Sequence, residues 1–585
     1  MIDINEIEYK LSLLPKGYIS KKTINGKVQC YLQWNENGKK KSKYINSNNL
    51  AFVKKQIETR KKLEKELNKL AINTNYVSDN SFMYFSSNVL FSNTLKEFIS
   101  NVKDFKKRNI YNELNDYIYS NSNKVFILYG LRRTGKTTLI KQAILNMNKN
   151  DFAATAFIQI DNKIDLKALN KDIKVLKENG YKYIFIDETT LMNDFIEGAA
   201  LFSDIYTQSG IKIILSGTDS LGFMIARNNQ LYDRCILAHT TFIPYKEFET
   251  VLNIKGIDNY IQYGGTMSIS GKHYNDSIFS SVSSTDEYID SSIAYNIQHS
   301  LQNYQNESHF RSLYELYKNN ELTNAINRII EDINHRFTKE VITKDFISND
   351  LAISSKNLRN DINEPNDILD NIDIKKVTNN LMKLLEIKNK ENQNIKITKN
   401  HIIEIEEYLE LLELIYHVDI NYIPVKDNKS DKIIFTQPGI RYSQANSLIQ
   451  SLMKDKLFSS LGVKERNYIT NRILNEIKGR MMEDLILLET SIAKKDKYVF
   501  KLQFSIGEYD MLVVDEKKLE VDIYEIKHSD KIIDKQTRFL KDTKLLKETE
   551  FRYGTIKSRN VIYNGKTLKK DGIKYINVEE YLLNI

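Results

Sequence analysis

The stretch from residue 125 to residue 143 constrains the fold of this chain more than any other. VFILY (125–129) has the length and residue types of a buried strand, and TLIKQA (138–143) begins a helical pattern. Between them, GLRRTGKT (130–137) matches GxxxxGK[ST] at every fixed position. Glycines in such a turn let backbone amides approach phosphate oxygens, and the helix N-terminus adds positive potential. The sequence therefore predicts a strand, a phosphate-binding loop and a helix.

The residue types of this loop are those that bind ATP together with Mg²⁺. Lys136 would reach the β and γ phosphates, and the Thr137 hydroxyl would bind the metal ion. The residues predicted to bind the nucleotide here are Gly130, Arg133, Thr134, Gly135, Lys136, Thr137 and Thr138. The alternative is a chance match in a glycine turn, which the flanking strand and helix disfavour.

Two later strands end in polar residues at places that suit such a loop. YIFID ends at Asp187, which would hold Mg²⁺ through water, and Glu188 would polarise the water that attacks the γ phosphate. IKIIL is followed by Ser216 and Thr218, and either hydroxyl would sense the γ phosphate; an ordinary loop start is the alternative. Hydrolysis of this kind usually also uses an arginine. The candidates are Arg132, Arg133, Arg227, Arg234 and an arginine from a neighbouring subunit.

The pattern of strands and helices divides the chain into four regions. They are a basic β-hairpin and helix module (1–75), a P-loop α/β domain (91–270), a helical and winged-helix-like region (271–470) and a second α/β domain (471–585). The second region alternates β-rich runs with helical patterns, which predicts a parallel sheet.

The third region is the least clearly patterned. Residues 266–300 are rich in Ser, Gly and Asp, which predicts a loop or insertion. Residues 338–359 are similar to a helix-turn-helix, which would either contact DNA or pack on the core. Residues 402–418 predict an apolar helix, and residues 432–436 a wing strand.

The last region carries a second set of residues that suggest chemistry. Glu483 lies in a predicted helix, Asp510 on a predicted strand, and Glu525 and Lys527 on the next strand. Asp510 and Glu525 would share a divalent metal ion, which lowers the pKa of a water and stabilises a leaving phosphate. Lys527 would face the same side as Glu525, because side chains alternate along a strand. The alternative is an amphipathic hairpin with a charged solvent face. The residues predicted to be catalytic are Glu188, Glu483, Asp510, Glu525 and Lys527.

The excess positive charge of the chain is confined to its first region. The net charge is +9, and residues 1–70 hold 16 Lys and Arg against 7 Asp and Glu. Residues 17–34 predict a hairpin with its turn at Asn25-Gly26. Lysines interleaved with aromatic residues on such a ribbon suit contact with phosphates, and a solvated surface is the alternative. A basic module predicts a polyanionic partner, nucleic acid before membrane.

On these motifs, the chain resembles prokaryotic AAA-like ATPases of the STAND and archaeal-ATPase type. The resemblance rests on GLRRTGKTTL, YIFIDE, LSGTDS, LYDR and PYKEF, and it covers residues 95–585. It implies an ATPase core followed by helices, a winged helix and a restriction-endonuclease-like domain. The last region is similar to the PD-(D/E)xK nuclease fold, with Gln536 as an auxiliary position. That resemblance implies either a nuclease or a module that keeps the fold for binding.

Other sequence features indicate the cellular compartment in which the protein is expected to act. Cys30 and Cys235 are the only cysteines, which suits a reducing cytoplasm and excludes a disulfide framework. No stretch reaches the roughly 18 uninterrupted apolar residues of a membrane span. The first residues lack the basic head and apolar run of a secretory signal. We therefore expect a cytoplasmic protein without a membrane partner.

Together these observations predict a multidomain ATPase that handles nucleic acid, DNA rather than RNA, in genome defence or a mobile element. ATP would set a conformational state, and the C-terminal domain would bind or cut nucleic acid. The main alternative is a signalling switch with an inactive nuclease fold, in which ATP controls assembly as a homo-oligomer or with a partner protein. A helicase or motor is a third class, for which the sequence offers no further motif.

Overall fold

The computed structural model divides the chain into two compact units, residues 1–84 and residues 85–585. The residues it describes are 14–15, 17–24, 27–36, 39–45, 49–50, 53–62, 85–161, 163–192, 194–267, 279, 281–303, 310–341, 397–425, 430–454, 462–532 and 537–585. Most of the predicted helix-turn-helix, and Gln536, lie outside these residues. No helix in this part of the chain is long and apolar enough to cross a membrane.

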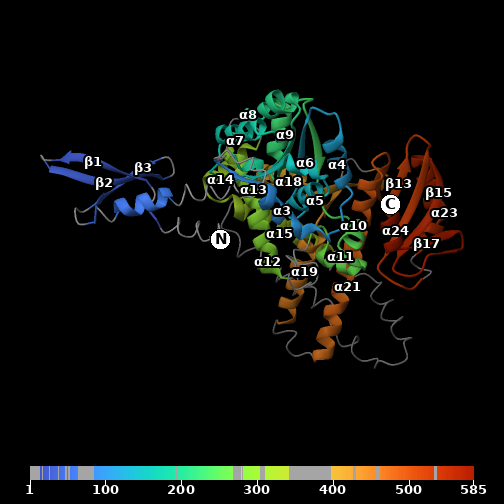
Figure 1. The fold of residues 1–585 in the computed structure, drawn as a ribbon. Coiled ribbons are helices and arrows are strands. Elements are labelled where there is room, and N and C mark those ends of the chain that lie inside the picture. The colour runs from blue at the N-terminus through green and yellow to red at the C-terminus, as the bar shows by residue number, and fades with distance from the viewer. Residues whose placement is uncertain are drawn as a thin grey trace. The chain divides into compact units, whose positions relative to one another are not determined.

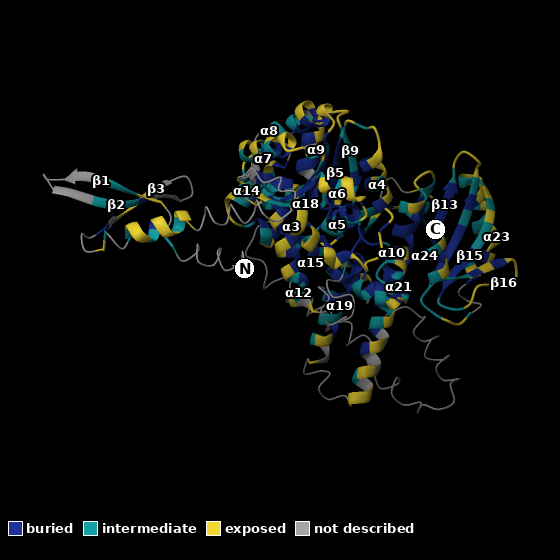
Figure 2. Ribbon diagram, in the orientation of Figure 1, coloured by how far each residue is buried: buried dark blue, intermediate teal, exposed yellow. Residues whose placement is uncertain are grey.

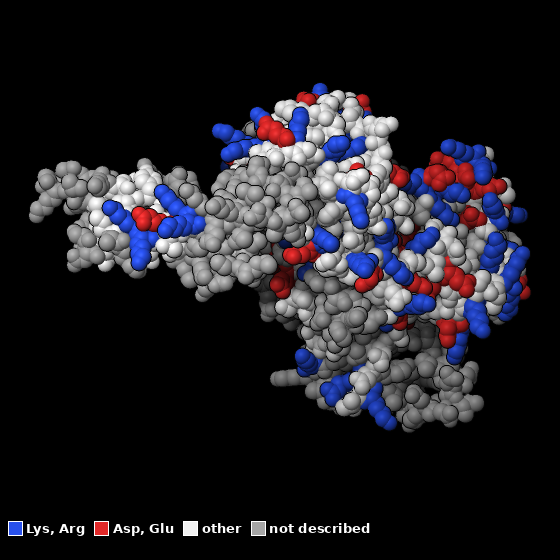
Figure 3. Space-filling view, viewed as in Figure 1, with Lys and Arg blue, Asp and Glu red and all other residues white. Residues whose placement is uncertain are grey.

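The first unit contains a three-stranded antiparallel sheet in the order β1-β2-β3. Its strands are β1 (Tyr18–Ile24), β2 (Lys27–Glu36) and β3 (Lys39–Ile45). Ile24 pairs with Lys27, which agrees with the hairpin predicted around Asn25-Gly26. A helix over residues 53–62 exposes four lysines and one glutamate, and its face in Figure 3 is mostly cationic.

A six-stranded sheet in the order β4-β6-β7-β8-β5-β9 carries the phosphate-binding loop. Its strands are β4 (Asn88–Phe91), β5 (Val125–Tyr129), β6 (Thr155–Gln159), β7 (Tyr183–Asp187), β8 (Lys212–Gly217) and β9 (Cys235–His239). All neighbours pair in parallel except β4, which is antiparallel to β6. The predicted parallel α/β sheet is therefore confirmed, with one antiparallel edge strand.

Helices cover both faces of this sheet (Figure 1). The bounds are α3 (Ser92–Ile99), α4 (Tyr111–Tyr119) and α5 (Lys136–Leu145) on one face, and α7 (Leu166–Glu178), α8 (Phe195–Gly198) and α9 (Ser220–Asn229) on the other. Side chains that alternate along β5 enter the two cores: Ile127 packs with α7 to α9, and Leu128 with α3 to α5. The fully apolar strands of the sequence are thus buried on both faces.

Residues 281–300 fall within the stretch predicted to be a loop or insertion (266–300), but they are helical, and the helix continues to residue 303. They form α12 (Val282–Tyr288), a π-helical turn (Ile289–Ala294) and α13 (Tyr295–Asn303). Ser281 and Ser284 cap the start of α12, so serine marks a helix end here rather than a loop. Ile289, Ile293 and Ile297 recur every four residues and pack into one hydrophobic cluster.

The predicted helix over residues 402–418 is also wrong in its second half. Helix α18 (Lys399–Leu411) ends early, and Ile415 begins strand β10 (Ile415–Ile423). Strand β10 pairs with β11 (Ser430–Phe435), and Ile415 packs with Tyr408 in the cluster that also holds Ile289. Because the apolar run continues from the helix into the strand, hydrophobic periodicity alone does not show where the helix ends and the strand begins.

An eight-stranded mixed sheet has the order β11-β10-β12-β13-β14-β15-β17-β16. The further strands are β12 (Tyr498–Phe504), β13 (Glu508–Asp515), β14 (Glu520–Lys527), β15 (Thr555–Tyr563), β16 (Leu568–Lys570) and β17 (Ile573–Asn577). Strands β12 to β14 are antiparallel, and β15 and β17 continue in parallel. The β10–β11 hairpin extends the sheet through a parallel pairing of β10 with β12.

Helices lie on both faces of this second sheet, in which β13 is almost entirely buried and β15 is buried in its second half, residues 560–563 (Figure 2). They are α21 (Val463–Ala493) and α24 (Val578–Asn584) on one face, and α22 (Arg538–Lys541) and α23 (Thr543–Tyr553) on the other. The cluster under α21 continues into α10 (Tyr245–Thr250) and α11 (Ile257–Tyr263), which follow β9. One hydrophobic core therefore joins the P-loop domain to the C-terminal sheet.

Candidate functional site

The phosphate-binding loop lies between β5 and the N-terminus of α5, as the sequence predicts. Gly130 has φ +142° and Gly135 has φ +90°, which are backbone conformations that favour glycine. A Cβ on Gly130 would lie 2.4 Å from the carbonyl oxygen of Thr240, so the close approach of β9's end also requires glycine there. Thr134 bonds the Leu131 carbonyl at 2.8 Å and the Thr240 hydroxyl at 2.9 Å, which fixes the middle of the loop.

Lys136 turns its ammonium group back onto the loop. Its Nζ donates to the carbonyl oxygens of Gly130 and Leu131, each at 2.8 Å. Burial lowers the pKa of Lys136 to about 8, although Glu188 and Asp187 act in the opposite direction. A phosphate bound in the loop would add a close negative charge to this buried amine, whose hydrogen bonds go to carbonyl oxygens.

The polar ends of three neighbouring parallel strands meet beside Lys136. The Thr137 hydroxyl donates to Asp187 Oδ2 at 2.7 Å, and the Ser216 hydroxyl donates to Asp187 Oδ1. Thr218 lies 3.5 Å from Glu188 Oε2. Burial raises the pKa of Glu188, and the Asp187 carboxylate adds to this effect. Hard oxygen donors on Thr137 and Asp187 are those that Mg²⁺ prefers, so the residues present fit that ion.

Arg108, for which the sequence predicts no role, holds the phosphate-binding loop through a hydrogen bond to Thr134. It is buried, and its side chain donates to Glu247 Oε2 at 2.5 Å and to the Thr134 carbonyl at 2.7 Å. It also donates to the carbonyls of Thr241 and Phe242, each at 3.2 Å. Most of its hydrogen-bond partners are backbone carbonyls, which every residue has, so the sequence does not reveal them. Its one side-chain partner among these contacts is Glu247, within PYKEF.

Residues of the helices that follow the P-loop domain contact the phosphate-binding loop. Arg132 donates to the Ser291 carbonyl at 3.2 Å, and the Arg133 guanidinium lies 6.0 Å from the Tyr288 ring centre. Asn296 of α13 lies 3.2 Å from the Thr218 hydroxyl. Of the other candidate arginines, Arg234 pairs with Asp204 and Arg227 is exposed. Elements on both sides of residue 270 therefore contact the nucleotide-binding motifs.

Asp510, Glu525 and Lys527 meet at the ends of β13 and β14. Lys527 Nζ lies 3.2 Å from Asp510 Oδ2 and 3.1 Å from Glu525 Oε2. Glu483 on α21 is connected to them through Lys501, whose Nζ lies 3.6 Å from Glu483 and 3.8 Å from Asp510. The four predicted residues thus belong to one charged network. It also contains Lys501, Arg480 and Glu508, which were not predicted from the sequence.

The two strand carboxyls of this network have different electrostatic environments. Burial raises the pKa of Glu525 well above its ordinary value, although Lys527 opposes this. Burial also acts on Asp510, but Lys527 and Lys501 outweigh it and hold the pKa of Asp510 below its ordinary value. The Oε1 atom of Glu525 is buried and accepts no hydrogen bond from the described residues. A divalent cation beside Asp510 and Glu525 would satisfy that oxygen.

Among the described residues, no group of three or more His, Cys, Asp or Glu side chains is placed to hold a metal ion. A cation between Asp510 and Glu525 would therefore rely on two carboxylates, with water or backbone oxygens completing its coordination. Lys527 contacts both carboxylates and would have to move aside from the shared position.

Comparison with known proteins identifies the P-loop region. Residues 122–249 match the family model described as "AAA domain", and residues 3–55 match a "Domain of unknown function (DUF6788)". No curated protein matches the chain. Among solved structures, the ORC1 protein of Aeropyrum pernix in complex with DNA is similar at 11% identity, over 62% of this chain and 96% of that chain, with a TM-score of 0.22. The predicted AAA-like P-loop ATPase domain is confirmed by the family match.

Proposed function

We propose that this chain, whose residues 122–249 form an AAA domain, hydrolyses ATP in order to control a C-terminal domain that binds or cleaves nucleic acid. The observation that carries the first half is the meeting of Lys136, Thr137, Asp187 and Glu188 at the ends of adjacent parallel strands. These are the groups that phosphoryl transfer to water requires.

In this proposal the loop amides and Lys136 bind the β and γ phosphates of ATP. Thr137 and Asp187 hold Mg²⁺, which neutralises phosphate charge, and Ser216 orients Asp187 through its hydrogen bond. Glu188 accepts the proton of the attacking water, a role that its raised pKa suits. Thr218, which contacts both Glu188 and Asn296, would report the state of the γ phosphate to α13.

The second half of the proposal rests on the network around Lys527. The order α21, β12, β13, β14, α23 and β15 resembles the PD-(D/E)xK arrangement, with Asp510 on the second strand and Glu525 and Lys527 on the third. Asp510 and Glu525 would hold a divalent metal ion, which supplies a nucleophilic water for phosphodiester cleavage. Lys527 would orient that water, and Glu483 would position Lys501. The unsatisfied Glu525 Oε1 supports this assignment.

Contacts between the two sites support their coupling. Arg108 bonds both the loop residue Thr134 and Glu247 on α10. At the start of the same helix, the Tyr245 amide donates to Glu489 Oε1 on α21 at 2.7 Å, and the Tyr260 hydroxyl donates to the same atom at 2.7 Å. Helix α21 also carries Glu483, so a shift of the loop would be transmitted to the C-terminal network through packed, hydrogen-bonded elements.

The N-terminal unit would add affinity for the nucleic acid. Lys54, Lys55, Lys61 and Lys62 are exposed on one short helix beside the antiparallel sheet. Clustered cations of this kind neutralise backbone phosphates, with binding that weakens as salt rises. We propose DNA rather than RNA as the partner and the cytoplasm as the location.

Incubation with plasmid, linear and single-stranded DNA, in Mg²⁺ or Mn²⁺ and with or without ATP, tests the proposal. We expect cleavage by the unchanged protein, none by Lys527→Ala, and an altered ATP response in Lys136→Ala. Lys518→Ala is the matched control, because Lys518 lies in the neighbouring turn with its side chain 68% exposed. Absence of cleavage under every condition, with ATP turnover intact, would reject the nuclease.

One observation favours the alternative of an assembly switch. Lys527 and Lys501 already neutralise Asp510 and Glu483, so the network is satisfied apart from one oxygen without any metal ion. In that case ATP would control self-association or a partner protein through the same α10–α21 contact. ATP-dependent oligomerisation without cleavage would identify this function.

A further inference from the structure

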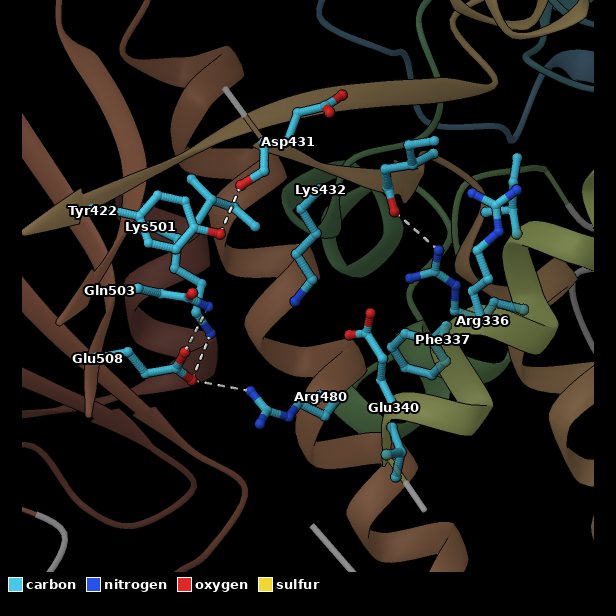
Figure 4. A pocket seen from close by; sticks show the side chains of 16 residues that line it. Arg336, Phe337, Glu340, Tyr422, Asp431, Lys432, Arg480, Lys501, Gln503 and Glu508 are labelled. Atoms are coloured by element: carbon cyan, nitrogen blue, oxygen red, sulfur yellow. Dashed lines mark hydrogen bonds and ion pairs between the residues drawn. The ribbon is translucent and has the colours of Figure 1, made fainter. Parts of the chain in front are cut away.

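A cavity of about 390 Å³ lies between the helical region and the C-terminal sheet. Helix α15 (Leu322–Glu340) forms one wall, and strands β10 to β13 with α21 form the other. Figure 4 shows Arg336, Phe337 and Glu340 facing Arg480, Lys501 and Glu508 across it. Its volume lies in the range of small-ligand sites, far below what a nucleic-acid duplex would need.

The lining of this cavity is rich in cations. Five positively charged side chains contribute to it, against three carboxylates. The five are Arg336, Lys432, Arg441, Arg480 and Lys501, and the three are Glu340, Asp431 and Glu508. Arg441 and Lys432 are both held by Asp484, a buried carboxylate of α21 that does not line the cavity. Arg441 and Lys432 are therefore fixed from outside the cavity, whereas Arg480 and Lys501 are positioned by Glu508 in its wall. Side chains held by such partners form a preorganised site.

The cavity shares wall residues with the network around Lys527. Lys501 lines the cavity with a side chain only 5% exposed, and its Nζ lies 3.8 Å from Asp510 Oδ1. Arg480 also lines it and bonds Glu483 at 2.8 Å. A ligand phosphate held by Arg480 and Lys501 would thus be next to the phosphodiester at which the carboxylates would act.

Aromatic side chains complete the lining. Tyr422 of β10 contributes its ring, and its hydroxyl bonds Ser430 at 2.8 Å. Phe337 of α15 lies under the guanidinium of Arg441, 4.3 Å from ring centre to Cζ. Aromatic rings and guanidinium planes are the surfaces on which unpaired bases stack.

We propose that this cavity binds one unpaired nucleotide, with its phosphate at Arg336, Arg480 and Lys501 and its base against Tyr422 and Phe337. The inference deepens the proposed function, because it makes single-stranded or locally unpaired nucleic acid the substrate class of the C-terminal site. Either a nucleotide within a strand or a free nucleoside monophosphate has this chemistry.

Photo-crosslinking of the full chain in EDTA tests the proposal, since no strand can be cut there. The probe is a short 5′-phosphorylated oligothymidylate with 4-thiothymidine at its 5′ end, used single-stranded and as a blunt duplex. We expect the single strand to crosslink within β10, residues 415–423, and Arg336→Ala to weaken that crosslinking by about tenfold. Lys339→Ala, which removes a neighbouring exposed cation that does not line the cavity, should leave it unchanged.

Crosslinks confined to residues 1–62, equal crosslinking of the duplex, or equal effects of the two substitutions would overturn the proposal. Thymidine monophosphate as competitor distinguishes the two ligand sources: displacement at β10 assigns the site to free nucleotides as well, and persistence assigns it to strands alone. Because crosslinking in EDTA measures binding alone, its result is independent of the cleavage assay and of the effect of Lys527→Ala on cleavage.

Discussion

Replacing Arg108 tests whether a buried arginine holds the phosphate-binding loop in place. Arg108 and Glu247 each expose only 5% of their side chains, and their atoms lie 2.5 Å apart. Removing one partner of a buried ion pair costs about 3–5 kcal/mol, because the other charge is left buried and uncompensated. We therefore expect Arg108→Ala to lower the free energy of unfolding of the P-loop domain by about 3–5 kcal/mol. It should also weaken ATP binding, since the Thr134 carbonyl loses its donor.

Urea denaturation followed by far-ultraviolet circular dichroism measures this loss, and ATP titration measures the second effect. Arg311→Ala is the control, because Arg311 forms an exposed pair within one helix that contributes about 0.3–0.5 kcal/mol. Combining Arg108→Met with Glu247→Leu removes both charges and should recover more than about 1 kcal/mol of the loss. The reasoning is refuted if Arg108→Ala costs no more than Arg311→Ala, or if the double substitution is as damaging as the two single losses added.

Two further predictions use titrating groups at the two ends of the coupling path. Because burial lowers the pKa of Lys136 to about 8, the free protein loses the ammonium charge as pH rises above 8, and its affinity for ATP should fall. Titration calorimetry from pH 7 to 9.5 measures this change. An affinity that does not depend on pH over this range would contradict the prediction. Burial raises the pKa of Glu489 from 4.5 to about 7. The stability that the folded protein gains from binding this proton is therefore fully present below pH 4.5, and it is lost as pH rises through 7. Glu489→Gln should therefore reduce the loss of stability between pH 5 and pH 8 by about 3 kcal/mol, as urea midpoints at the two pH values would report; an unchanged pH dependence would show that Glu489 is not buried as a neutral acid.

The sequence was sufficient to predict that the candidate nucleotide-binding residues lie together, because they follow adjacent parallel strands. Lys136, Asp187 and Ser216 each follow an apolar run that forms a strand on its own evidence, and parallel neighbours bring such ends together. The pairing of Asp510 with Lys527 follows from a short antiparallel hairpin for the same local reason.

Features that depend on distant contacts were not predictable in this way. Arg108 acts on backbone carbonyls 26 and more residues away, which no residue pattern records. The helices over 281–303 were not predicted because the stretch is rich in serine, whereas the spacing of Ile289, Ile293 and Ile297 carries the helical signal. The first residues of strand β10, 415–418, were predicted to be helical because the pairing partners of this strand, β11 and β12, are specified elsewhere in the chain.

The steady-state rate of ATP hydrolysis by the unchanged chain and by Glu188→Gln tests the central claim most directly. Both proteins should bind ATP with Mg²⁺ at similar affinity, since Lys136, Thr137 and Asp187 are retained. We predict that the unchanged chain releases phosphate and that Glu188→Gln does so about 10²–10⁴-fold more slowly, because the attacking water loses its base. Equal rates in the two proteins, or ATP binding by the unchanged chain without any phosphate release, would contradict the account.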